Sequence, residues 1–211
     1  MSDTLQQILT AVGGLAAGIA CAAALLVQQS RLLARACRDA RHDDITGLPN
    51  RRALLAAAQR RLRAGRPFGL IIIDLDRFKQ VNDTFGHATG NDVLTEIGRR
   101  LTALRRPVTV AARLSGDEFA VLVDGDLDDT AGAAYLAQRA IMATPVLLPD
   151  RAWPVAASVG YSIARLGVDV TGLLAEADLA MYHAKRAGGG VRRYEPSMAP
   201  TTPTRRPRDD R

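Results

Sequence analysis

Cysteine and aromatic residues are scarce in this chain of 211 residues. The two cysteines, Cys21 and Cys37, precede the part of the chain that looks globular, and no Cys-x-x-Cys motif occurs. A disulfide framework or a structural zinc site is therefore not expected, which fits a reducing compartment. Aromatic residues make up 4% of the chain and hydrophobic residues 47%, so the core must be mainly aliphatic.

Positive charge exceeds negative charge, with 28 Lys and Arg residues against 22 Asp and Glu residues and a formal net charge of +6. A basic chain can indicate a nucleic-acid partner. Here the arginines gather at residues 31–41 and 205–211, which is more typical of a membrane-flanking segment and a solvated tail. Because stacking aromatics and a basic helix face are missing, no nucleic-acid partner is predicted.

Residues 8–27 form a run without any charged side chain. A run of that length can cross about 30 Å of hydrocarbon. Arginines follow it, so the positive-inside rule places the C-terminal side in the cytoplasm. We predict a short segment at 1–7, a transmembrane helix at 8–28 and a juxtamembrane signalling helix at 29–42, in a single-pass protein of the inner membrane. The alternative is an amphipathic or buried helix of a soluble protein.

One domain is expected from residue 43 to residue 194, followed by a disordered tail at 195–211 that is dominated by Pro, Thr and Arg. Apolar periodicity divides the domain into helices and strands. Helices are expected near 55–62, 94–104, 133–143 and 174–184, and strands near 70–73, 108–114, 119–123, 155–163 and 191–194. The strands at 108–114 and 119–123 read as a hairpin, and the acidic stretch 124–129 as a solvated loop.

Two acidic clusters stand out, Asp74-Leu75-Asp76 after the buried strand and Asp117-Glu118 in the hairpin. Alternation along a strand puts Asp74 and Asp76 on one face, and both clusters converge if the strand and the hairpin are neighbours. Gathered carboxylates repel one another unless a cation lies between them, and Mg²⁺ leaves positions for water and phosphates. Taken alone, either cluster is better explained as solvated acids or helix caps, so the charge pattern indicates no more than a possible metal site.

Five segments of the chain, in order, resemble the motifs of the GGDEF family. They are residues 44–52, 74–90, 113–119, 157–160 and 177–185, and the third reads Arg113-Leu-Ser-Gly-Asp-Glu-Phe119. The resemblance covers residues 41–194. It implies an α/β domain of the α+β sandwich kind, with a central, mostly antiparallel sheet wrapped by helices, similar to polymerase palms and class III nucleotide cyclases.

The resemblance implies a magnesium site, with Mn²⁺ as a possible substitute. Asp74 and Asp117 match metal ligands, and the Leu75 carbonyl adds a third ligand. Glu118 assists the metal or takes the proton of a 3′-hydroxyl, so Asp117 and Glu118 are the predicted catalytic residues. Asp76 is either a ligand or a support for one.

The resemblance also implies a set of residues that bind the nucleotide GTP. The turn Ser115-Gly116 is expected to expose backbone N–H groups near the triphosphate. The side chains that match positions around the base or the phosphates are Asn82, His87, Asn91, Lys79 and Lys185. The three phenylalanines Phe78, Phe85 and Phe119 are expected in the core.

The chain departs from the family pattern at several positions. Ser115 stands where a glycine is usual, and serine resists a positive φ. Asn91 replaces an aspartate that reads guanine, and an amide offers only one acceptor where guanine presents two donors. Gly189 replaces a phosphate-binding arginine, and Arg106-Pro-Val-Thr109 lacks the carboxylate of a product-inhibition site, so that site is expected to be absent.

The expected reaction joins two GTP molecules into cyclic di-GMP with release of pyrophosphate. Because one domain holds one nucleotide, a homodimer is part of the prediction. The alternatives are a cyclase with relaxed purine specificity, favoured by Asn91, or a degenerate domain that binds GTP or a protein partner and makes nothing. Asp92 begins a helix in this interpretation and is not expected to replace the missing carboxylate.

Overall fold

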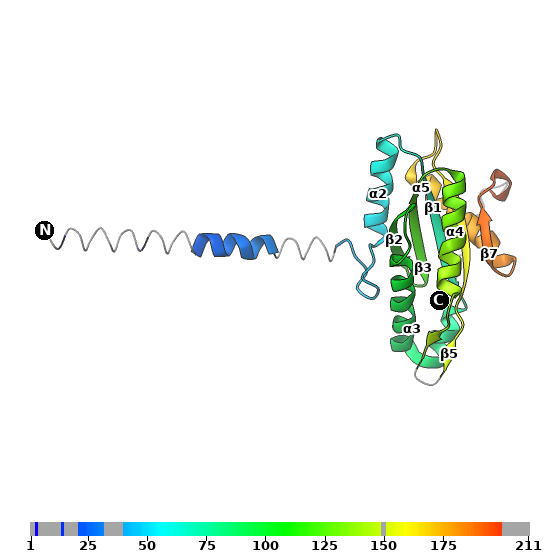
Figure 1. The fold of residues 1–211 in the computed structure, drawn as a ribbon, viewed down its shortest axis with the longest axis horizontal. Helices are drawn as coiled ribbons and strands as arrows, with labels where there is room; N and C mark the ends of the chain where they lie inside the picture. The colour runs from blue at the N-terminus through cyan, green and yellow to red at the C-terminus, as the bar shows by residue number, and fades with distance from the viewer. Residues whose placement is uncertain (1–2, 4–13, 15–20, 32–39, 149–150, 200–211) are drawn as a thin grey trace. The chain divides into compact units, whose positions relative to one another are not determined.

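The computed structural model describes residues 3, 14, 21–31, 40–148 and 151–199 (Figure 1). The chain divides into two units, residues 1–41 and residues 42–211. Residues 21–31 of the first unit are helical. The predicted span 8–28 lies mostly outside the described ranges, and among the residues within them no helix combines the length and apolar character needed to cross a bilayer.

Among its described residues, the second unit contains a five-stranded sheet with the order β2-β3-β1-β6-β7 and four α-helices. All neighbouring strands are antiparallel except β6 and β7, which are parallel. The helices are α2 (Arg51–Arg63), α3 (Phe78–Thr102), α4 (Leu127–Met142) and α5 (Val170–Arg186). The strands of this sheet are β1 (Phe68–Asp76), β2 (Val108–Ser115), β3 (Glu118–Asp124), β6 (Ala156–Ile163) and β7 (Gly190–Arg193). The predicted fold class is confirmed.

A second, two-stranded sheet is formed by β4 (Val146–Leu147) and β5 (Ala152–Trp153). It was not predicted, because strands of two residues are too short to show a periodicity. A short 3₁₀ helix, η1 (Pro196–Met198), lies in the segment that was expected to be disordered, so residues 195–199 correct that expectation.

Strand β1 is central, and both of its faces are buried. Ile71 and Ile73 face the core formed with α3 and α4, whereas Leu70 and Ile72 face the core formed with α2 and α5. A continuous apolar run is what a strand covered on both faces requires. The same alternation carries Asp74 onto the α5 side of the sheet.

Two local expectations about helices are wrong. The acidic stretch 124–129 is not a loop throughout, since Asp126 caps α4 in a reciprocal capping box with Asp129 and the helix begins at Leu127. Asp92 does not begin a helix but lies inside α3. The break in α3 falls at Gly86 instead, where φ of 82° and ψ of 162° suit a residue without a Cβ.

Helix α5 packs very closely on β6 at Gly160. A Cβ at this position would lie 2.0 Å from the backbone nitrogen of Met181 and 2.3 Å from the carbonyl oxygen of Ala177. Because both atoms belong to the helix backbone, only glycine permits this approach. Gly160 thereby sets the depth at which α5 and its Lys185 lie over the sheet.

Candidate active site

The two acidic clusters meet at the end of β1. Asp74 is directly opposite Glu118 in the β1–β3 register. The N–H of Leu75 donates to the carbonyl of Asp117 at 3.3 Å, so the Leu75 carbonyl, which points to the same side of the strand, also faces the hairpin. The predicted convergence of Asp74, Asp117 and Glu118 is therefore confirmed, whereas their chemical roles stay predictions.

Asp74 is a buried carboxylate with one direct cationic partner. Nζ of Lys185 donates to Oδ1 of Asp74 at 2.6 Å. Burial, assisted by the charges of Asp117 and Glu118, raises the pKa of Asp74 to about 6, although the hydrogen bond and the charge of Lys185 lower it. Burial alone would lower the pKa of Lys185, but the hydrogen bond to Asp74 and nearby acids raise it above its ordinary value.

The arrangement fits a magnesium ion that also holds substrate. Within the part of the chain that the structure describes, no three acidic, His or Cys side chains are gathered into a ready-made metal site. Mg²⁺ does not require one, since it is held by one or two carboxylates together with substrate phosphates. Asp74 and Asp117 would be those carboxylates, since both clusters lie at the end of β1.

Asp76, the last residue of β1, is held by the neighbouring strand β6. Its Oδ1 accepts a hydrogen bond of 2.7 Å from the hydroxyl of Ser158, which is fully buried on β6. Ser158 is also the register partner of Asp74. This contact favours the supporting role over the ligand role for Asp76.

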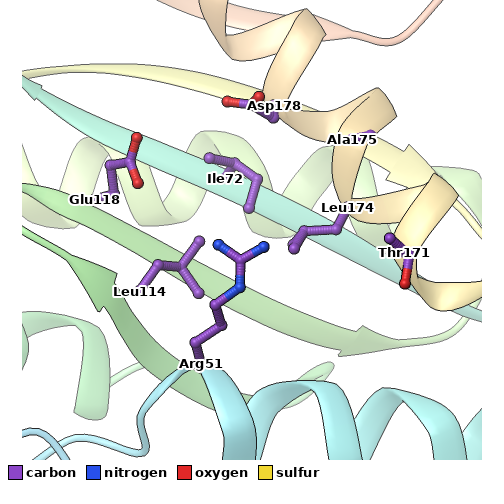
Figure 2. A pocket seen from close by; sticks show the side chains of 8 residues that line it. All are labelled: Arg51, Ile72, Leu114, Glu118, Thr171, Leu174, Ala175 and Asp178. Atoms are coloured by element: carbon purple, nitrogen blue, oxygen red, sulfur yellow. The ribbon is translucent and has the colours of Figure 1, made fainter. Parts of the chain in front are cut away.

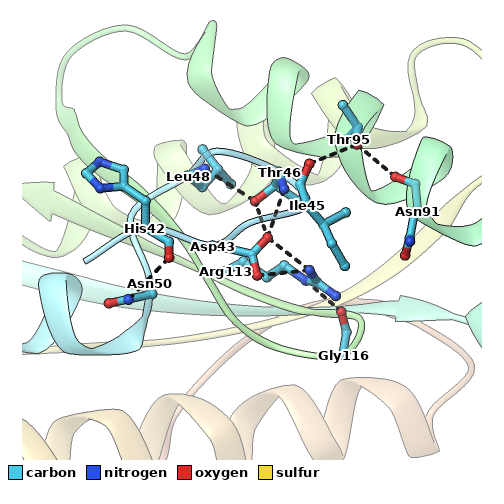
Figure 3. A network of polar contacts seen from close by, with 10 residues as sticks. All are labelled: His42, Asp43, Ile45, Thr46, Leu48, Asn50, Asn91, Thr95, Arg113 and Gly116. Atoms are coloured by element: carbon cyan, nitrogen blue, oxygen red, sulfur yellow. Dashed lines mark hydrogen bonds and ion pairs between the residues drawn. The ribbon is translucent and has the colours of Figure 1, made fainter. Parts of the chain in front are cut away.

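The hairpin turn is braced by Arg113 (Figure 3). Nε of Arg113 donates to the carbonyl of Gly116 at 2.9 Å, and Nη1 contacts both oxygens of Asp43. Asp43 also accepts from the backbone N–H and the hydroxyl of Thr46. Sequence reasoning assigned the first motif to Asp44, which is exposed, and missed Asp43. The sequence signal for Asp43 was its spacing to Thr46, because an Asp-x-x-Thr segment favours a turn in which the Asp side chain accepts a hydrogen bond from the backbone.

Ser115 causes no backbone strain in the turn. Gly116 has the positive φ, at 50°, and among the residues that the structure describes Arg77 is the one non-glycine residue in that region. The concern that serine resists a positive φ therefore does not apply at position 115. Its hydroxyl donates to Oε2 of Glu118 at 3.1 Å, which orients that carboxylate.

The break in α3 brings two of the predicted nucleotide-binding positions together. A Cβ on Gly90 would lie 1.9 Å from Oδ1 of Asn82, so the amide of Asn82 lies directly over this glycine, next to Asn91. The backbone carbonyl of Asn91 accepts from the hydroxyl of Thr95 at 2.8 Å. His87 and Lys79 are exposed on the same helix.

A cavity of about 340 Å³ adjoins the hairpin on the α2 and α5 side of the sheet. Arg51, which sequence reasoning left without a role, extends into it between Leu114 and Leu174, and Glu118 and Asp178 lie on its wall (Figure 2). A cation in the first turn of a helix opposes the helix dipole, and this was the available signal that Arg51 serves another purpose. Arg51 and Glu118 thus line the same cavity.

The backbone conformation at position 189 explains why a glycine stands there instead of an arginine. The φ of Gly189 is 108°, which an arginine would adopt only with strain. A Cβ there would be 3.6 Å from Oδ2 of Asp76. The nearby guanidinium of Arg186 lies 5.9 Å from the ring centre of Tyr182.

Together these features define an α/β domain with an acidic site, countered by one lysine, at the end of its central strand. Residues 40–190 match the family described as "Diguanylate cyclase, GGDEF domain". The chain belongs to the GGDEF family.

Individual relatives agree with this assignment. An "Uncharacterized signaling protein" of Caulobacter vibrioides is 43% identical over 162 residues, which is 74% of this chain and 20% of that protein. "Diguanylate cyclase TpbB" of Pseudomonas aeruginosa is 38% identical over 162 residues, covering 73% of this chain and 37% of that protein. Some other relatives are named cyclic di-GMP phosphodiesterases. The chain thus spans well under half of these first two relatives.

A solved structure matches the fold closely. The coiled coil and GGDEF domain of DgcB from Caulobacter crescentus, in complex with c-di-GMP, superposes with a TM-score of 0.76 at 25% identity. The match covers 85% of this chain and 98% of that one.

Proposed function

We propose that this chain is a diguanylate cyclase that condenses two GTP molecules into cyclic di-GMP and releases pyrophosphate. The observation that carries the proposal is the buried Asp74, held beside Lys185 and opposite Glu118 at the end of the central strand. Retained acids that repel one another lower stability unless they serve a cation. The names of relatives such as TpbB support the same reaction.

Each condensation forms one bond between a 3′-oxygen and an α-phosphorus and breaks the bond from that phosphorus to pyrophosphate. Bound Mg²⁺ would neutralise the triphosphate and favour ionisation of the 3′-hydroxyl. Glu118, oriented by Ser115 and with Arg51 nearby, takes the hydroxyl proton. Lys185 offsets charge on the leaving phosphates. The step occurs twice to close the ring.

A homodimer follows from the chemistry, since each domain binds one nucleotide and two must face each other. Bringing two reactants together in fixed geometry removes several kcal/mol of barrier, on the order of 7–11 kcal/mol in well-oriented systems. The predicted helices at 8–28 and 29–42 would hold two copies together at the membrane, with the domain in the cytoplasm.

Product inhibition is proposed to be weak. The stretch Arg106-Pro-Val-Thr109 ends in a threonine whose hydroxyl is already engaged, since it accepts from Arg61 at 2.8 Å and donates to the carbonyl of Leu122 at 3.1 Å. Thr109 provides no carboxylate for an added ligand. Initial rates should therefore be unchanged by low concentrations of added product, and a sharp loss of rate would contradict this.

Two variations of the function have specific observations behind them. Asn91 favours relaxed purine use, because an amide can pair with the donor and acceptor that adenine presents. Asn91 and Gly189 together favour a domain that binds GTP without turnover. Ser115 no longer adds to that alternative, since it is unstrained and contacts Glu118.

The test is turnover by the full chain with Mg²⁺ and GTP, ATP or an equimolar mixture, with products separated by chromatography. Asp117→Ala and Glu118→Ala are the inactive controls. Cyclic di-GMP made by the wild type and lost in both controls supports the proposal. Saturable GTP binding without product would favour the non-catalytic alternative, and strict use of GTP would remove the relaxed-specificity alternative.

A further inference from the structure

The β4–β5 hairpin contacts α3 at its break. The ring of Phe85, the residue before Gly86, lies edge-on to the ring of Trp153 on β5, with the ring centres 5.5 Å apart. The guanidinium of Arg151 lies 5.1 Å from the centre of the same Phe85 ring. Phe85 is therefore held by an aromatic edge and a cation, both from one hairpin.

The hairpin is also fixed to α3 at its base. Arg100, a buried residue of α3, donates to the carbonyl of Thr144 at 2.7 Å, just before β4 begins. Val146 of β4 pairs with Trp153 of β5, so the support reaches the aromatic contact directly. Two attachments on one helix, at Arg100 and at Phe85, fix the second part of α3 relative to its break.

The break determines where the nucleotide-binding positions lie. Asn82 precedes it and Gly90 follows it, and Oδ1 of Asn82 lies over Gly90. The hydroxyl of Thr89 donates back across the break to the carbonyl of Phe85 at 3.0 Å. A shift of Phe85 would therefore move Asn82 relative to Asn91.

We propose that Trp153 is a positioning residue for the nucleotide base, because its contact with Phe85 fixes the break in α3 that brings Asn82 beside Gly90 and Asn91. This rests on the proposed function, in which that segment holds the base. Trp153 touches no substrate in this proposal and acts through Phe85.

Trp153 is the one tryptophan of the chain, so its fluorescence reports on this contact. The full chain is titrated with a GTP analogue that has a methylene group between its α and β phosphates, and free tryptophan provides the correction for light absorption. A saturable change in emission is expected, and it should disappear in Phe85→Leu. Unchanged emission at a concentration where calorimetry shows the analogue bound would overturn the proposal.

Variants separate positioning from folding. Trp153→Ala should weaken analogue binding roughly 3- to 10-fold and raise KM with little change in kcat, as expected for loss of one aromatic pair. Trp153→Phe should restore binding, and Leu147→Ala, on the exposed part of the same hairpin, should leave it unchanged. Thermal melting confirms that each variant is folded.

The outcomes distinguish this inference from the function on which it rests. A wild-type chain that fails to bind the analogue overturns the proposed function and this inference together. A wild-type chain that binds the analogue while Trp153→Ala binds it equally well overturns the positioning role alone.

Discussion

Arg113 holds both carboxylate oxygens of Asp43, at 2.9 and 3.0 Å, across 70 residues of sequence. Asp43→Ala should lower the free energy of unfolding by about 2 kcal/mol, because it leaves a buried guanidinium without this partner. Asp44→Ala, at the adjacent exposed position, should change it by less than about 0.5 kcal/mol. Urea denaturation of both variants measures the difference, and equal effects would show that the pair does not stabilise the fold.

The same pair predicts a dependence of stability on pH. Burial alone would raise the pKa of Asp43, but hydrogen bonds from Thr46 and Arg113 outweigh it and leave the pKa below its ordinary 3.8. Because the pKa of Asp43 is lower in the folded state than in the unfolded state, its ionised carboxylate stabilises the fold at pH values above the unfolded-state pKa. That stabilisation is lost as the pH falls through the folded-state pKa. Asp43→Ala should therefore lose less stability than the wild type on acidification below about pH 4.

Asp74 predicts a dependence of stability on pH that is opposite in sign to that of Asp43. Its pKa is raised from 3.8 to about 6 in the folded state. The stabilisation that its protonated form contributes is therefore fully present below pH 3.8 and is lost as the pH rises to about 6. Asp74→Asn should therefore unfold at higher denaturant concentration at neutral pH, by on the order of 1 kcal/mol, while turnover is lost.

Magnesium provides the control for this prediction. Mg²⁺ with the GTP analogue should raise the melting temperature of the wild type more than that of Asp74→Asn, since binding stabilises only the state that binds. An Asp74→Asn variant that is less stable than the wild type at neutral pH, and is stabilised equally by Mg²⁺ and the analogue, would contradict the interpretation of Asp74 as a cation-binding carboxylate.

Asn91→Asp should increase the preference for GTP over ATP. An aspartate accepts from both donors on the guanine edge, whereas the asparagine leaves one contact unmade, which costs about 1–3 kcal/mol. The ratio of kcat/KM for GTP to that for ATP should rise roughly 10-fold. Asn91→Ala is the matched control and should lower catalysis with GTP without raising the ratio. An unchanged ratio in Asn91→Asp would mean that this side chain does not read the base.

The sequence was sufficient to predict the sheet and the meeting of the acids, because apolar runs define strands and a hairpin must return beside its neighbour. Asp74 and Glu118 are register partners for this reason. The sequence was not sufficient to choose between Asp43 and Asp44, because two adjacent acids cannot be distinguished without the structure of the turn. In that turn Asp43 accepts the hydrogen bond from the backbone N–H of Thr46. The roles of Arg51 and Trp153 depend on how far a side chain reaches, which no periodicity reports.

Gly90 offers a way to move Asn82 without unfolding the domain. A Cβ on Gly90 would be 1.9 Å from Oδ1 of Asn82, which is the free end of a side chain and can rotate away. Gly90→Ala should therefore keep the free energy of unfolding within about 1 kcal/mol, because alanine also favours the helix. It should raise KM for GTP roughly 10-fold by displacing the amide.

Gly132→Ala in α4 is the matched control, since a Cβ there meets nothing within 4 Å. It should stabilise the helix by about 0.5–1 kcal/mol and leave KM unchanged, because only the gain in helix propensity applies. If Gly90→Ala instead unfolds the domain, Asn82 is held too firmly to rotate and its contact with Gly90 is structural. If Gly90→Ala leaves both stability and KM at the wild-type values, Asn82 does not position the nucleotide. Only a raised KM with retained stability supports the placement of the base at the break in α3.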